Sequence, residues 1–263
     1  MRDTFFVVPL ALLALCAAPA AQAQMIEAKD FSIQASAAGR SGPEYLGSDN
    51  YKFGFKPEFK VTWKRSLFLS SDEGLGLYLI NTPANMPTHT MLGMSVMRDG
   101  GRDASDFAEL SGTETVQSTI YARLMGEYSF SDFAVGASIR QAFTNDRSDR
   151  AASLYTTYKY GLMPNLTGNV TGSVTWASEE YMDRYFGINA AEATASGLPR
   201  HDVSDGFRDV TLSTGLSYAP YDTGVSVDGR LQWTRLVGDA ADSPLTKSAD
   251  QYSLTVGMAY RYN

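Results

Sequence analysis

The sequence predicts an all-β protein built as a single antiparallel transmembrane β-barrel. Three observations lead to this fold class. Apolar and polar side chains alternate with a period of two along much of the chain, as they do on a strand with one lipid face and one watery face. The alternating runs are about nine to thirteen residues long, the length that a tilted strand needs to cross a bilayer, whereas strands in soluble sandwiches average about five or six. Many runs also begin or end in aromatic residues, like the interfacial girdles of membrane barrels.

Seven segments carry the alternation clearly. In the last of them, Leu254 and Val256 fall on one face and Thr255 on the other. Pro57, in the first, lacks the N–H that a ladder bond needs, so we expect a bulge or local disorder there. In chain order the seven segments are 51–63, 116–130, 133–143, 166–176, 210–218, 223–234 and 252–262.

Five weaker segments complete a set of twelve strands, an even number, as single-chain bacterial barrels have. The tripeptide Asp72-Glu73-Gly74 separates two of them. If it is instead a bulge within one longer strand, the alternative is a barrel of ten strands. The weaker segments are 31–39, 66–70, 74–81, 89–97 and 152–160.

The connections between these segments differ in length in a regular way, which predicts the orientation of the barrel. Short periplasmic turns and long outer loops are typical of membrane barrels. Connections after even-numbered strands are mostly short, at 64–65, 82–88, 131–132, 161–165 and 219–222. Connections after odd-numbered strands include the long ones, which we expect to face outward, at 40–50, 98–115, 177–209 and 235–249.

The longest connection, 177–209, contains a predicted short helix near 190–196. Asn189 followed by Glu192 resembles a capping box, and Gly197 is a helix stop. Burying a large apolar side chain gains about 1.5–3 kcal/mol, so we expect this loop to fold over the barrel mouth, against the upper lumen wall and the loop 235–249. Tyr181, Tyr185 and Ile188 also follow helical spacing and are expected on one face. The alternative is that the aromatic residues dip into the outer-leaflet interface. The candidate lid contacts are Tyr181, Tyr185, Phe186, Ile188 and Leu198.

The first 23 residues have the features of a secretory signal peptide. Arg2 gives a positive start, residues 5–15 form a short apolar core, and Ala-Gln-Ala at 21–23 fits signal peptidase. We expect cleavage after Ala23, which leaves a barrel domain at 24–263 and removes Cys16, the single cysteine. An exported barrel of this kind belongs in the outer membrane of a Gram-negative bacterium, in contact with lipid and lipopolysaccharide.

Charged residues fall on the predicted inner face of the barrel. The chain has 22 Lys+Arg against 29 Asp+Glu, a net charge of −7, which argues against a nucleic-acid partner because such proteins need a basic patch. The inward charges would either line a selective channel or form salt bridges that fill a narrow barrel, and the sequence does not decide between the two. They are Lys52, Lys56, Lys60, Arg123, Glu127, Arg140, Asp228, Arg230 and Arg261.

We predict no catalytic residues and no cofactor. The chain has two histidines, His89 and His201, and no Gly-x-Ser-x-Gly elbow. Asp202 cannot serve His201 as a catalytic partner, because adjacent side chains on an extended chain point apart. Asp239 and Asp242 are weak candidates for a metal site, for which stabilisation of loop turns is the favoured alternative.

Short motifs spread over nearly the whole mature chain resemble the MltA-interacting protein (MipA)/OmpV family of outer-membrane proteins. Each motif is weak alone, but their order along the chain is specific. The resemblance implies a scaffold that holds a murein-cleaving lytic transglycosylase near a bifunctional peptidoglycan synthase. The alternative function is a small diffusion or uptake channel for polar solutes, which the charged lumen favours. The motifs are 45–49, 74–76, 101–106, 138–141, 175–177, 185–188, 196–199, 234–239 and 242–244.

Overall fold

The fold is described from a computed structural model that defines residues 30–83, 86–144, 148–220 and 223–262. The expected signal peptide, 1–23, lies outside the described residues. Within the described residues, no helix is long and apolar enough to cross a membrane.

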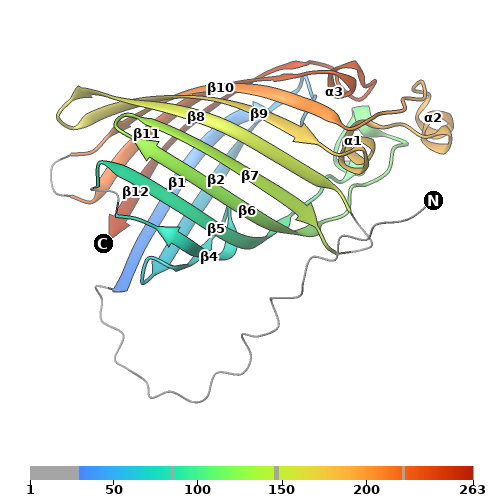
Figure 1. Cartoon of the computed structure of the whole chain (residues 1–263). Coiled ribbons are helices and arrows are strands. Elements are labelled where there is room, and N and C mark those ends of the chain that lie inside the picture. The colour runs from blue at the N-terminus through green and yellow to red at the C-terminus, as the bar shows by residue number, and fades with distance from the viewer. Residues whose placement is uncertain (1–29, 84–85, 145–147, 221–222, 263) are drawn as a thin grey trace, which may run out of the picture.

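Twelve antiparallel strands close into one barrel, in which each strand pairs with its neighbours in the chain and β1 pairs with β12 (Figure 1). The predicted fold class and strand count are confirmed. Ten strands are excluded because β3 and β4 pair with each other as separate strands. The strands are β1 (Phe31–Pro43), β2 (Tyr51–Trp63), β3 (Leu67–Ser70), β4 (Gly74–Asn81), β5 (Thr88–Asp99), β6 (Thr119–Phe130), β7 (Phe133–Ala142), β8 (Arg150–Met163), β9 (Leu166–Ala177), β10 (Gly206–Tyr218), β11 (Val225–Leu236) and β12 (Asp250–Tyr262).

The two faces of the barrel wall have opposite character. On β12, Leu254 and Val256 are 51% and 53% exposed on the outside, whereas Gln251 and Ser253 are buried on the inside. At the end of the barrel with the short turns, aromatic rings stack across β6, β7 and β8 with centroids 4.8 to 6.0 Å apart. An apolar belt edged by aromatic residues suits a bilayer and its interface. The stacked residues are Tyr128, Phe130, Phe133, Tyr158 and Tyr160.

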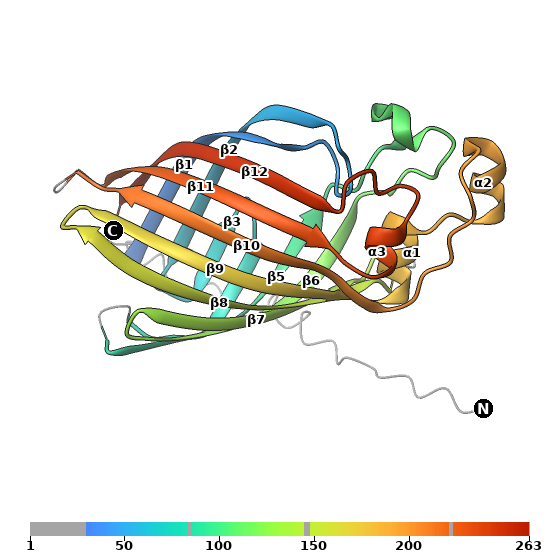
Figure 2. The ribbon, with the colours of Figure 1, turned by 90° about the horizontal axis from the view of Figure 1, so that it is seen from above.

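The long connections gather at one end of the barrel together with the helices (Figure 2). These helices are α1 (Glu179–Phe186), α2 (Ala190–Ser196), α3 (Asp239–Asp242) and the short 3-10 helices η3 (Ala104–Asp106) and η4 (Ala108–Leu110). The predicted asymmetry of short turns and long loops is confirmed. The outer connections are 44–50, 71–73, 100–118, 143–149, 178–205 and 237–249.

Residues 51–59 of β2 lie outside the pairing with β3, because the hairpin β3–β4 is short and β3 pairs only with residues 60–63. The backbone of Phe59 bonds to Ser71, and since backbone groups alternate in direction, the nitrogen of Pro57 points to the same side. Its missing N–H therefore breaks no ladder bond. The expected bulge at Pro57 is wrong, because β1 and β2 stay in register through the pair Ala37–Pro57.

Strand β6 begins at Thr119, later than the predicted segment 116–130. Val116 continues the apolar alternation in the sequence, but its backbone pairs with Arg102 inside the outer loop and its side chain is buried. The apolar alternation in the sequence therefore continues beyond the strand, into an outer loop that has its own apolar core.

Candidate functional site

Helix α1 follows β9 and turns the chain across the outer mouth of the barrel. Ser178 occupies the N-cap position, and Glu179 and Glu180 lie in the first turn, where acidic side chains favour the helix dipole. A hydrogen bond from Ser178 holds the pKa of Glu180 below its usual value. The buried side chains of α1 are Tyr181, Met182 and Phe186.

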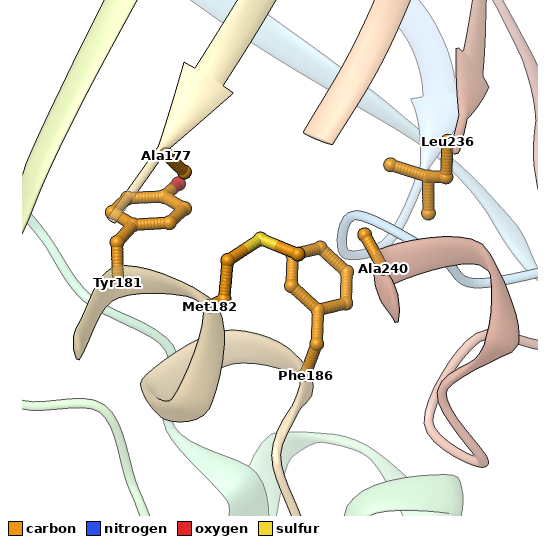
Figure 3. Close-up of a cluster of buried hydrophobic side chains, with 6 residues drawn as sticks. All are labelled: Ala177, Tyr181, Met182, Phe186, Leu236 and Ala240. Carbon is orange, nitrogen blue, oxygen red and sulfur yellow. The ribbon is translucent and has the colours of Figure 1, made fainter. Parts of the chain in front are cut away.

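A first buried cluster joins α1 to the wall beneath it (Figure 3). Tyr181, Met182 and Phe186 point from the helix toward the strand ends. Leu236 at the end of β11 and Ala240 of α3 complete the contact, and all five side chains are at most 4% exposed. Full burial of each large apolar side chain gains about 1.5–3 kcal/mol, so α1 is held firmly over the mouth.

A second buried cluster joins the remaining outer loops. Ile188, just after α1, is 1% exposed. The Tyr45 hydroxyl donates to the carbonyl oxygen of Leu245 at 3.3 Å, and burial raises the pKa of Tyr45 to about 12. Four outer loops thus share one apolar packing unit, and we call α1 with these two clusters the lid. The second cluster consists of Tyr45, Ala104, Leu110, Ile188 and Leu245.

Helix α2 packs against the second cluster through Ala193. The Asn189 side chain accepts the N–H groups of Ala191 and Glu192, and the Glu192 carboxylate accepts the N–H of Asn189. Gly197 ends the helix with a φ of 73°. The predicted helix near 190–196 is confirmed with its cap and its stop. The N–H of Glu114 also donates to Glu192 at 2.8 Å, which ties α2 to the loop 100–118.

Arg102 is a buried cation within the lid. Its Nη1 donates to the carbonyl oxygen of Tyr185 at 3.0 Å. Its guanidinium carbon lies 5.8 Å and 5.7 Å from the ring centroids of Tyr45 and Tyr185. Burial lowers the pKa of Arg102. Cation–π contacts are worth up to about 2 kcal/mol when desolvated, so the two rings offset part of the cost of burying this charge.

A polar network lies beneath α1 at the top of the lumen. Arg208 Nη2 contacts the Asp209 carboxylate at 2.6 Å, and Arg208 Nη1 donates to the Tyr181 hydroxyl at 2.7 Å. Arg140 donates to the same hydroxyl at 3.4 Å and lies 3.5 Å from the Asp99 carboxylate. The Tyr181 hydroxyl therefore connects the lid to arginines on β7 and β10.

The lumen holds a polar cavity of about 780 Å³. Lys56 contacts the carboxylates of Glu58 at 2.6 Å and Asp72 at 2.9 Å. Such mixed charges fill the interior of the barrel and keep it polar. The charged residues that line this cavity are Arg40, Lys56, Glu58, Asp72, Asp228 and Arg230.

The structure places all five predicted lid residues at the outer mouth. Tyr181 and Phe186 belong to the first cluster and Ile188 to the second, while Tyr185 and Leu198 are partly buried beside them. Tyr181 and Tyr185 stack at 4.6 Å on α1. The expectation that Ile188 shares their helix face is wrong, because α1 ends at Phe186.

The predicted lumen residues fall into separate groups. Lys56, Asp228 and Arg230 line the 780 Å³ cavity, whereas Arg123 and Arg140 line a smaller one with Arg208. The others lie elsewhere along the wall: Lys52 over the Phe107 ring, Lys60 paired with Glu73, Glu127 bonded to the Tyr155 hydroxyl, and Arg261 opposite Gln34.

Arg208 was missed because the strand that contains it has an irregular register. A shift between Phe207 and Asp209 interrupts the pairing of β10 with β9. As a result the adjacent Arg208 and Asp209 are both shielded from solvent, with side chains 14% and 4% exposed. The sequence feature that could have identified this site is an adjacent Arg and Asp at the point where the apolar–polar alternation of the strand is interrupted.

The weak metal candidates Asp239 and Asp242 lie in α3, where the Asp239 carboxylate accepts the N–H of Ser204 at 2.7 Å. In another outer loop, the Asp103 carboxylate accepts the N–H of Ser105 at 3.0 Å, and this bond lowers the pKa of Asp103. Among the residues that the structure defines, no three His, Cys, Asp or Glu side chains form a potential metal site. Asp103 therefore stabilises a turn within its own loop, whereas Asp239 ties α3 to the loop 178–205.

A closed barrel with an apolar exterior and a polar interior is the architecture of an outer-membrane β-barrel protein, and this chain is one. The family model of the MltA-interacting protein MipA matches residues 35–262, so the chain belongs to that family. The resemblance noted in the sequence is thereby confirmed.

Solved structures show likeness of the fold at low identity. The outer-membrane protein OmpT of Vibrio cholerae is 9% identical over 89% of this chain and 97% of its own, with a TM-score of 0.39. Neisserial surface protein A is 12% identical over 89% and 97%, with a TM-score of 0.28. OprB of Pseudomonas putida is 9% identical over 79% and 59%, with a TM-score of 0.41. No curated protein sequence matches the chain.

Proposed function

We propose that this protein is an outer-membrane scaffold that holds a murein-cleaving lytic transglycosylase near a peptidoglycan synthase. The observation that carries the proposal is membership of the family named for interaction with MltA. The lid supports it, because a mouth packed with buried side chains from four loops suits an anchor better than a permanently open pore. In this proposal the protein reaches the membrane with a cleaved signal peptide at 1–23.

The scaffold needs no catalysis of its own, and the surroundings of the two histidines suit that role. His89 stands at the start of β5, where its Nδ1 lies 2.7 Å from the Thr82 carbonyl oxygen. His201 belongs to the outer loop 178–205, and its Nε2 lies 2.9 Å from the carbonyl oxygen of Asp239. The two rings contact carbonyl groups at opposite ends of the barrel.

Affinity capture from detergent-solubilised envelopes tests the scaffold. With the intact barrel as bait, we expect enrichment of murein enzymes over a mock capture. A bait with an insertion in the short turn 131–132 should capture less enzyme if the partner binds the periplasmic rim. A bait with an insertion between Pro199 and Arg200, at the outer end, should capture as much as the intact barrel. Equal recovery of murein enzymes with all baits and with the mock would contradict the scaffold.

The second candidate function is a gated diffusion channel for polar solutes, and the charged cavity of about 780 Å³ favours it. Deletion of residues 183–200 removes Phe186 and Ile188 from the lid. If the lid gates a pore, conductance in planar bilayers should rise markedly after the deletion. Unchanged conductance in a correctly folded barrel would reject the channel and leave the scaffold untouched.

A further inference from the structure

Two arginines face each other across neighbouring strands at the top of the lumen. Arg123 on β6 and Arg140 on β7 are direct cross-strand partners. Like charges in that position repel and destabilise a sheet. Arg208 of β10 borders the same space, so three guanidinium groups line one cavity of about 270 Å³.

The carboxylates around this cavity do not balance its positive charge. Arg140 pairs with Asp99 and Arg208 pairs with Asp209. Arg123 instead donates to the neutral Ser138 hydroxyl at 3.5 Å, and within the described part of the chain no ion pair includes it. The next inward carboxylate on β6, Glu127, accepts the hydroxyl groups of Tyr155 and Ser129 instead. The three arginines therefore form ion pairs with two carboxylates, and Arg123 is the one without such a pair.

Hydroxyl groups line the cavity one layer below the arginines. Ser138 of β7 is the cross-strand partner of Ser153 on β8, which is in turn the partner of Thr175 on β9. The Ser153 and Thr175 oxygens are 3.3 Å apart. Hydroxyl groups can turn to donate to an anion. Above the cavity, the Tyr181 hydroxyl of the lid accepts from Arg140 and Arg208.

We propose that this cavity binds a small oxyanion, the carboxylate or phosphate group of a solute. Guanidinium groups match the geometry of such groups and form strong charge-assisted hydrogen bonds with them. The bound anion supplies the missing negative charge and relieves the repulsion between Arg123 and Arg140. Because Tyr181 contacts the other two arginines, the site lies directly under the lid. This site is independent of the scaffold function.

Titration calorimetry on the refolded full barrel in detergent tests the proposal. Sodium phosphate and sodium acetate are the probes, and sodium chloride at equal ionic strength is the reference. We expect saturable binding of at least one oxyanion, and the probe that binds identifies the group. Arg123→Gln should weaken this binding by about tenfold or more, as expected for loss of a hydrogen bond to a charged group. The same variant should unfold at a higher temperature than the wild type in buffer without oxyanions.

Arg235→Gln is the matched control, because Arg235 is exposed at the end of β11 and pairs with Asp250 at 2.9 Å. It should bind the probe as the wild type does. If Arg123→Gln does not fold, Ser153→Ala keeps every charge and should weaken binding by about fivefold, as for one lost hydrogen bond. Absence of oxyanion binding beyond chloride, or full binding by a folded Arg123→Gln variant, would overturn the site.

Discussion

Neighbouring side chains on β12 face opposite sides of the barrel wall, one toward lipid and the next toward the lumen. Leu254 is half exposed on the outside, while Thr255 lines the lumen cavity. Leu254→Arg should therefore cost roughly 2–4 kcal/mol of barrel stability if the residue lies near the bilayer midplane. Thr255→Arg should cost much less, because its charge can reach water in the lumen. Heat-modifiability on gels and urea unfolding in lipid measure the difference, and equal loss in both variants would show that the strand phase is wrong.

The phenol of Tyr45 gives the lid a dependence on alkaline pH. Burial, followed by the charge of Glu109, raises its pKa to about 12 from the ordinary value of 10.0. Folding thus favours the neutral phenol. This contribution to stability is complete below pH 10 and is lost as the pH rises from 10 to 12. In an absorbance titration, the difference between wild type and Tyr45→Phe should show one tyrosine that ionises near 12, whereas ionisation near 10 would mean that the ring is not buried.

The buried side chains of helix α1 stabilise the lid. Phe186 is 1% exposed, and its carbonyl oxygen accepts the Ser243 hydroxyl at 2.6 Å. Phe186→Ala should cost about 3–5 kcal/mol of local packing. The loss should fall on the lid, because Phe186 takes part in no strand ladder. We expect faster proteolysis within 178–205 and unchanged heat-modifiability of the barrel.

The control for that substitution is Arg200→Ala, since Arg200 is 62% exposed and pairs with the exposed Asp202. It should leave proteolysis of the loop unchanged. Loss of barrel folding by Phe186→Ala would contradict the separation of lid and wall.

The strands could be predicted because each needs only local information. Adjacent residues such as Leu254 and Thr255 differ in polarity, and this difference shows which face of the strand each one occupies. In the same way Asn189, Glu192 and Gly197 mark the start and the end of α2. For the hairpin β3–β4 the sequence allows two interpretations, because a short turn and a bulge use the same types of residue.

The lid and the sub-lid network could be predicted only in part, because they depend on contacts between distant loops. The apolar side chains of 177–209 indicated burial, but Leu110 and Tyr45 gave no such signal in their own loops. Arg208 was hidden by the irregular register of β10. The predicted bulge at Pro57 was wrong for a related reason. Its missing N–H costs no ladder bond because β3 is too short to pair with that part of β2.

The two ends of the barrel differ in structure. Packed loops, two apolar clusters and the three arginines lie toward one end, and short turns with stacked aromatic rings lie at the other. Membrane barrels have short turns on the periplasmic side and longer loops on the extracellular side. We therefore expect the lid to face outward, and in the proposed function the murein enzyme would then meet the rim with the short turns.

This orientation can be measured with two epitope insertions in one barrel. One epitope goes between Pro199 and Arg200, both exposed at the lid end, and the other goes into the turn Ser131-Asp132, which joins β6 to β7. Antibody should detect the first on intact cells and the second only after the outer membrane is permeabilised. Both sites lie outside the strand ladders, so the barrel should keep its heat-modifiability. The reverse pattern of detection would place the lid in the periplasm, within reach of the murein, and the closed mouth would then become the natural binding surface for the enzyme.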